Sequence, residues 1–180
     1  MKKFILSVTL LIMLNQVLAE GFTLRSNVVG GQIANEQVFS DFGCQGKNIS
    51  PQLVWSNAPK GTQSFAVSVY DPDAPTGSGW WHWLIFNIPG TVNELVADAG
   101  NTSKGLAPKD STQSINNYGK LGYGGACPPK GDKAHRYIFT VYALKVEKLE
   151  LDSKAMPALV GYYLNSNAIA RASLIAYYAH

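Results

Sequence analysis

The stretch SFAVSVYDPDAP, residues 64–75, joins a predicted β-strand directly to a stiff loop. Phe65, Val67 and Val69 alternate with Ala66, Ser68 and Tyr70, and this period of two is typical of a strand with one face on a core. The loop that follows holds two aspartates and two prolines, and proline fixes the backbone angle φ. The stretch therefore predicts a β protein with carboxylates held rigidly at the end of one strand.

Several other segments predict strands of the same fold. Residues 137–144 (YIFTVYAL) are rich in aromatic and β-branched side chains, whereas the continuous apolar run at 83–88 (WLIFNI) predicts a strand buried on both faces. Further strands are expected at 21–26, 51–56 and 173–178. Seventeen glycines and nine prolines separate these pieces, as turns do in antiparallel sheets. The pattern predicts a mainly β, antiparallel architecture.

One segment has a helical period instead. Apolar or aromatic residues fall at 156, 159, 160, 163 and 164, which lines one helical face and indicates core packing. Pro157 suits the first turn, and Asp152 or Ser153 could cap it. A short C-terminal helix at 156–168 is expected before the last strand. The longest irregular stretch, residues 98–125, is expected to be functional or to wrap the fold.

The N-terminus indicates export. Lys2 and Lys3 precede an almost wholly apolar run at 4–14, and residues 17–19 (VLA) resemble a signal peptidase site. We expect a signal peptide at 1–19, with an uncleaved anchor as the alternative, and a single domain at 20–180 in the periplasm or outside the cell. The two lysines account for two of the three net positive charges of the chain. With no cluster of lysine or arginine elsewhere, nucleic-acid binding is not expected.

The two cysteines, Cys44 and Cys127, are expected to form a disulfide, because an exported chain meets oxidising conditions. Two buried free thiols are the alternative. A zinc site is not expected, since no close cysteine pair of the C-x-x-C kind is present.

Two of the three histidines occupy similar positions. His180 is the last residue and is expected to be frayed, but His82 and His135 each stand at or just before the head of a predicted strand, near a proline-containing loop. If these strands are neighbours, both histidines and one or both of Asp71 and Asp73 meet at one end of the fold. A nearby carboxylate would fix the imidazole tautomer and favour the protonated ring, which binds anions.

Three ordered motifs carry a family resemblance: DPDAP at 71–75, the W-x-H of residues 80–82, and CPPKGDKAHRY at 127–137. They resemble the phosphatidylethanolamine-binding protein family, and GKNISPQLVW at 46–55 resembles its bacterial YbhB/YbcL-like branch. The resemblance implies an antiparallel β-sandwich with a small anion-binding cavity at one end. It also implies binding without catalysis and without a cofactor.

The resemblance assigns the cavity residues one by one. Together with Asp73 from the loop, the candidate ligand-binding residues are Asp71, Asp73, Trp80, His82, Pro128, Pro129, His135 and Tyr137. The implied ligand is a small anion or a phospholipid head group, and a protein partner and a homodimer are further implications. The short TGSG loop before Trp80, and Cys127 in place of a glycine, depart from animal members, so kinase inhibition is not carried over.

Two other functions remain open from the sequence. A secreted interaction or inhibitor protein with a vestigial cavity would use the surface rather than the histidines. A metal-dependent hydrolase would use His82, His135 and Asp71 as zinc ligands, although no H-E-x-x-H motif is present.

Overall fold

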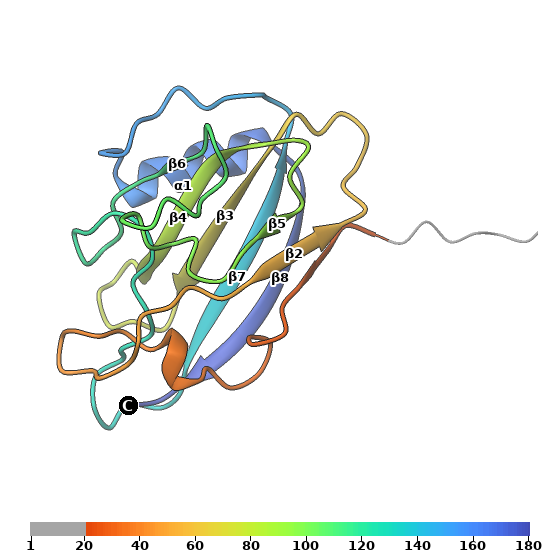
Figure 1. Ribbon diagram of the computed structural model, residues 1–180. Helices are drawn as coiled ribbons and strands as arrows, with labels where there is room; N and C mark the ends of the chain where they lie inside the picture. Colours follow the sequence, from red (N-terminus) through yellow and green to blue (C-terminus); the bar gives the residue numbers. More distant parts are fainter. Residues whose placement is uncertain (1–20) are drawn as a thin grey trace, which may run out of the picture.

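The computed structural model describes residues 21–180, so the expected signal peptide at 1–19 lies outside the described residues. Within them the chain forms two antiparallel sheets and one α-helix (Figure 1). The smaller sheet has the order β1-β2-β5, with β1 (Thr23–Arg25), β2 (Leu53–Ser56) and β5 (Glu94–Leu95). The larger sheet has the order β6-β4-β3-β7-β8, with β6 (Thr112–Gln113), β4 (Trp80–Pro89), β3 (Ser64–Asp71), β7 (His135–Leu144) and β8 (Ala168–Tyr178). A 3-10 turn, η1 (Asn35–Gln37), and the helix α1 (Pro157–Asn167) complete the elements.

The larger sheet is covered on both faces. One face packs on the smaller sheet through a core that includes Trp55, Val67 and Phe139. The other face packs on α1, where Leu84 and Phe86 belong to one cluster with Val160 and Leu164 of the helix. Both faces of β3 are therefore buried, and the expectation of a strand with only one buried face at 64–70 is wrong. The expectation of a doubly buried strand at 83–88 is confirmed.

The C-terminal helix lies close to its predicted position. It begins at Pro157 without a side-chain cap, and Asp152 instead accepts a hydrogen bond from the backbone of Lys154. The predicted capping by Asp152 or Ser153 is therefore wrong. Met156 and Leu159 are exposed rather than buried, so only the Val160–Leu164 side of the predicted stripe reaches the core.

The last strand is longer than predicted, because β8 follows α1 directly and pairs with β7 over the full length of both strands. Its first residues, AIARA, have low strand propensity, and the pairing with β7 outweighs that propensity. The long stretch 98–125 contains only the short strand β6, as expected of a wrapping segment. Within residues 21–180, no helix combines the length and the apolar character that a bilayer crossing requires.

The structure joins Cys44 to Cys127 by a disulfide, with 5.9 Å between the two Cα atoms. The bond ties the loop after η1 to the segment that leads into Pro128. His180 lies beside this bond: its Nδ1 is 3.6 Å from Cys44 Sγ, and its carbonyl accepts a hydrogen bond from Gly131. The expectation that His180 is frayed is therefore wrong.

Candidate functional site

The site lies where three neighbouring strands begin or end, at the lower end of the sheet in Figure 1. Asp71 is the last residue of β3, His82 is the third residue of β4, and His135 is the first residue of β7. Because β3 is antiparallel to both β4 and β7, these three positions meet at one end of the sheet. The structure thus brings together the two histidines and the aspartate that the sequence predicted to be neighbours.

Asp71 organises the loop that follows it. Its Oδ1 accepts hydrogen bonds from the backbone N–H groups of Asp73 (2.8 Å) and Ala74 (3.1 Å). This is an Asx turn, in which a short acidic side chain takes the place of a backbone acceptor. The carboxylate is almost fully buried, with 2% of the residue exposed, and its two hydrogen bonds help to hold the loop in this conformation.

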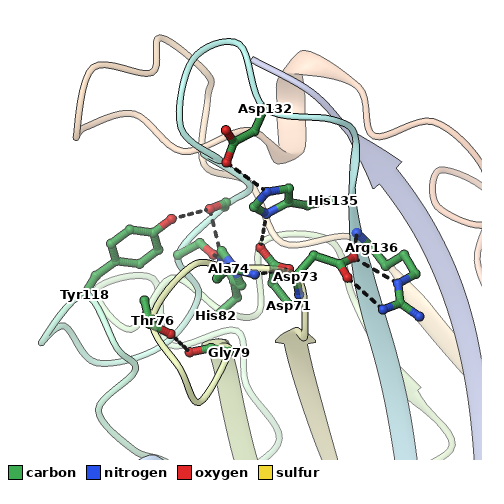
Figure 2. A network of polar contacts seen from close by, with 12 residues as sticks. Asp71, Asp73, Ala74, Thr76, Gly79, His82, Tyr118, Asp132, His135 and Arg136 are labelled. Carbon is green, nitrogen blue, oxygen red and sulfur yellow. Dashed lines mark hydrogen bonds and ion pairs between the residues drawn. The ribbon is translucent and has the colours of Figure 1, made fainter.

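The other oxygen of Asp71 pairs with His135. The Nδ1–H of His135 donates to Oδ2 of Asp71 at 2.8 Å, and Nε2 lies 3.5 Å from Oδ2 of Asp132 (Figure 2). The imidazole therefore stands between a buried carboxylate and a partly exposed one.

His82 has the opposite environment. Its Nδ1 lies 2.8 Å from the carbonyl oxygen of Gly124 and 3.1 Å from that of Gly125. A carbonyl oxygen only accepts, so Nδ1 carries the proton and donates it. Burial lowers the pKa of His82 to about 4, against the weaker opposing effects of these carbonyls and of Asp71. The carboxylate of Asp71 favours the protonated ring of His82, as expected, but burial outweighs this effect.

The second ring nitrogen of His82 has no such partner. Nε2 is buried and forms no hydrogen bond with any of the described residues. The indole Nε1 of Trp80 is in the same situation. Buried polar atoms without partners are rare in folded proteins and need an explanation such as a ligand or water.

Two tyrosines flank the His82 ring, with centroid distances of 5.5 Å to Tyr118 and 5.0 Å to Tyr137. Burial raises the pKa of each phenol well above its ordinary value, so both are neutral hydrogen-bonding groups. The hydroxyl of Tyr118 donates to the carbonyl of Gly125, which also accepts from His82 (Figure 2). Tyr118, which comes from the wrapping segment 98–125, was not among the residues that the sequence predicted for the site.

A cavity of about 170 Å³ opens between these groups. This volume is below the roughly 300–1,000 Å³ of sites for drug-sized ligands, and it suits a small polar group. The lining residues are Phe42, Asp71, Ala74, Pro75, Thr76, Trp80, His82, Tyr118, Cys127, Pro128, Pro129 and His135. Six of the eight candidates therefore line it. Tyr137 packs against His82 without lining the cavity, and Asp73 lies outside it.

Asp73 forms a clamp with the next strand instead. Its carboxylate accepts from the guanidinium of Arg136 at 2.9 Å and 2.7 Å, and from the backbone N–H of Arg136 at 2.9 Å. The hydrogen bonding to the Arg136 side chain is the largest of several effects that bring the pKa of Asp73 to about 2. This pair fixes the loop 71–75 to the start of β7, beside His135.

We expect Arg136→Gln to lower the stability slightly near neutral pH, because both partners are partly exposed and solvent screens the pair. The folded-state pKa of Asp73 is depressed, so the contribution of the pair is present above about pH 4 and is lost as the pH falls toward 2. Thermal unfolding of both proteins between pH 2 and 7 measures this. Curves that stay equally far apart at pH 2 and pH 7 would contradict the assignment.

The Nδ1–H groups of His82 and His135 donate to oxygen atoms, which leaves Nε2 free on both rings, as in most metal-binding histidines. The ligand atoms of His82, His135 and Asp71 nevertheless do not gather with metal-ligand spacing within the described part of the chain. In residues 21–180, the side chains that gather with metal-ligand spacing are Cys44, Cys127 and His180, and the two cysteines are joined to each other.

Comparison with known proteins places the chain in one family. The family model described as phosphatidylethanolamine-binding protein matches residues 29–179. The chain is 52% identical to the UPF0098 protein YbcL of Escherichia coli over 180 residues, which covers 99% of this chain and 98% of YbcL. It is 44% identical to YbhB of the same organism, over 83% of this chain and 94% of YbhB.

Solved structures give the same result. The crystal structure of Escherichia coli YbcL, described as a new member of the mammalian PEBP family, superposes with a TM-score of 0.87 at 53% identity, over 89% of this chain and 99% of that chain.

A further sequence relative, LppC of Mycobacterium tuberculosis, is 40% identical over 58% of this chain and 48% of its own length, and its name describes it as a candidate lipoprotein. The chain therefore belongs to the phosphatidylethanolamine-binding protein family, among its YbcL- and YbhB-like members.

Proposed function

We propose that the protein binds a small anion or a phosphate-type head group in the cavity between Asp71, His82 and His135, and that it catalyses no reaction. The observation that carries the proposal is the set of buried polar atoms around the cavity that have no partner among residues 21–180. Leaving such a group unsatisfied costs about 1–3 kcal/mol. A polar ligand that supplies the missing hydrogen bonds recovers this free energy.

The walls of the cavity are suited to binding. Pro128, Pro129 and Trp80 supply stiff apolar surface, and the loop 71–75 is held by Asp71 and by the Asp73–Arg136 clamp. A pocket whose walls are fixed before binding loses little conformational entropy when the ligand enters. The matched family is named for binding, and the names of YbcL and YbhB describe no enzyme.

We further propose that the protein acts outside the cytoplasm, in the periplasm or as a secreted protein. The apolar run near the N-terminus and the disulfide both fit an oxidising, exported location. The name of LppC places that relative among candidate lipoproteins, which fits an envelope location. A protein partner and a homodimer remain predictions from the family.

Filling the cavity tests the proposal. Ala74 is half-buried and lines the cavity, so Ala74→Leu is expected to weaken the binding of inorganic phosphate at least about tenfold, because the added methyl groups occupy ligand space. Isothermal titration calorimetry of the mature protein measures the affinity. Ala58→Leu is the matched control, since Ala58 is exposed near the opposite end of β3. Equal affinities in the two variants, or no phosphate binding by the wild type, would refute the proposal.

A further inference from the structure

A histidine lies beside the disulfide. Nδ1 of His180 is 3.6 Å from Sγ of Cys44, and ligand atoms of Cys44, Cys127 and His180 all lie within 4.8 Å of one another. Cys127 lines the cavity, but Cys44 and His180 do not. The three side chains therefore form a cluster of their own, which meets the cavity only through Cys127. The cysteines are 83 positions apart in the chain, so the sequence alone gives no sign of this cluster.

Hydrogen bonds to two loops keep His180 in this place. Near the end of β8, Tyr177 donates its backbone N–H to the carbonyl of Gly31 at 2.7 Å and accepts from the N–H of Ile33 at 2.9 Å. The carbonyl of His180 itself accepts from Gly131 at 3.3 Å. The C-terminus therefore stays at the lower end of the larger sheet (Figure 1). A side chain that is already in place loses little conformational entropy when it binds a ligand.

The spacing of the cluster fits zinc once the disulfide is reduced. Zinc binds thiolate sulfur at about 2.3 Å and histidine nitrogen at about 2.0–2.1 Å, in a tetrahedral arrangement. These values place sulfur and nitrogen about 3.6 Å apart, as Sγ of Cys44 and Nδ1 of His180 already are. They also place the two sulfur atoms about 3.8 Å apart, so the thiolates must separate after the bond breaks. Cys127 is partly exposed, and rotation of its side chain can supply this movement.

The surroundings of the sulfur atoms favour a cation. The backbone carbonyl oxygens of Asp41 and Phe42 lie 3.9 Å and 3.7 Å from Sγ of Cys127, and the negative ends of such dipoles attract positive charge. Cys44 is only 5% exposed, so its thiolate would be a costly buried charge without a partner. Thiolate sulfur is a soft ligand that selects zinc over magnesium and calcium. Two thiolates and one imidazole together carry the charge that balances Zn²⁺.

We propose that the reduced protein binds Zn²⁺ through Cys44, Cys127 and His180, with water in the fourth position. Reduction is a thiol–disulfide exchange: an external dithiol gives two electrons and two protons and becomes a disulfide, while the bond between Cys44 and Cys127 breaks. Zinc then displaces both thiol protons to solvent, which needs no further reductant or oxidant. The disulfide and the zinc ion are thus alternative links between the turn at 41–44 and the cavity wall. This site is independent of anion binding in the cavity.

Cobalt absorption tests the ligand set. The mature protein is reduced with a phosphine, and Co²⁺ is added without oxygen as a spectroscopic substitute for zinc. We expect one equivalent to give a thiolate-to-cobalt charge-transfer band and the intense visible bands of four-coordinate cobalt, and zinc to remove both. The oxidised protein is the matched control, since it has the same residues but no free thiolate, and it should give neither band. A reduced wild type without the charge-transfer band would overturn the inference.

The variant His180→Ala distinguishes the proposed ligand set from two thiolates alone. Competition with a chelator of known affinity measures zinc binding by the reduced proteins. We expect His180→Ala to weaken it at least about tenfold, because even the outer hydrogen-bond partners of metal ligands are worth that much. Asp132→Asn is the matched control: it alters a partly exposed carboxylate next to Gly131 and should leave zinc affinity unchanged. Equal zinc affinity in His180→Ala and the wild type, or an equal loss in Asp132→Asn, would refute the assigned ligands.

Stability provides a second measurement. Excess zinc is expected to move the urea midpoint of the reduced wild type back toward that of the oxidised protein, because a ligand that binds only the folded state stabilises it. If the reduced chain is unfolded without metal, circular dichroism during the same zinc titration should show it refold. Reduced His180→Ala should need at least about tenfold more zinc for either response. A reduced wild type that zinc neither stabilises nor refolds would contradict the site, whatever the outcome of the phosphate titrations.

Discussion

Replacing Asp71 by alanine is expected to lower the free energy of unfolding by about 3 to 5 kcal/mol, since it leaves three hydrogen-bond donors without their acceptor and each buried unsatisfied donor costs about 1–3 kcal/mol. The carboxylate is buried and accepts from the imidazole of His135 and from the backbone N–H groups of Asp73 and Ala74. Its removal leaves a buried imidazole and two loop N–H groups without their acceptor. For a domain of this size the change corresponds to a melting temperature lower by roughly 10 °C.

Asp132→Ala is the matched control, because Asp132 faces the other nitrogen of the same imidazole at 3.5 Å but is 43% exposed. Its loss is expected to change stability little. Urea unfolding of the wild type and both variants at pH 7 gives the comparison of stability.

The variant Asp71→Asn adds a second readout. The carboxylate of Asp71 raises the pKa of His82, so removing its charge is expected to lower that pKa further, as NMR titration of the ring would show. An Asp71→Ala variant as stable as Asp132→Ala would contradict the central role of this carboxylate.

The sequence shows where the site lies because its residues stand at strand ends. Asp71 follows an alternating strand, while His82 and His135 each stand at or just before the head of a predicted strand. Antiparallel pairing then brings these ends together, as β3 does with β4 and β7. The short strand β5 and the first residues of β8 could not be predicted, since pairing with β2 and β7 rather than local preference makes them strands.

Other features of the site depend on contacts between distant segments. Tyr118 and Phe42 line the cavity from segments with no strand or helix pattern, and only the folded chain shows which side chains of such segments turn inward. The charge of His82 is a clearer case. The sequence shows an aspartate nearby, which favours a protonated ring, but it does not show that the ring is fully buried or that two backbone carbonyls hold Nδ1. Burial outweighs the carboxylate, and the ring becomes an acceptor.

The disulfide holds the open side of the cavity together. It joins the turn at 41–44 to Cys127, and both Cys127 and the neighbouring Pro128 line the cavity. Phe42, which is 64% exposed, reaches the cavity from the same turn. Between the two cysteines, 83 positions apart, lie β3 and β4, two of the three inner strands of the larger sheet. The bond therefore restricts a large part of the unfolded chain.

Removing this bond is expected to cost about 4 kcal/mol of stability, the value that a loop of this length gives when loop closure restricts the unfolded chain. The double variant Cys44→Ala, Cys127→Ala tests this without adding a buried hydroxyl, since Cys44 is only 5% exposed. We also expect its phosphate affinity to fall severalfold, because Phe42 is no longer tied to the wall formed by Pro128. The wild type is also measured in strong thiol reductant, after titration has confirmed two free thiols. It should unfold at the same urea concentration as the double variant, which is lower than that of the oxidised wild type. If the reduced protein unfolds at the same urea midpoint as the oxidised one, the disulfide does not stabilise the fold. The turn at 41–44 would then be held by its other contacts, such as the salt bridge between Lys120 and Asp41 and the ring contact between Phe39 and Phe42.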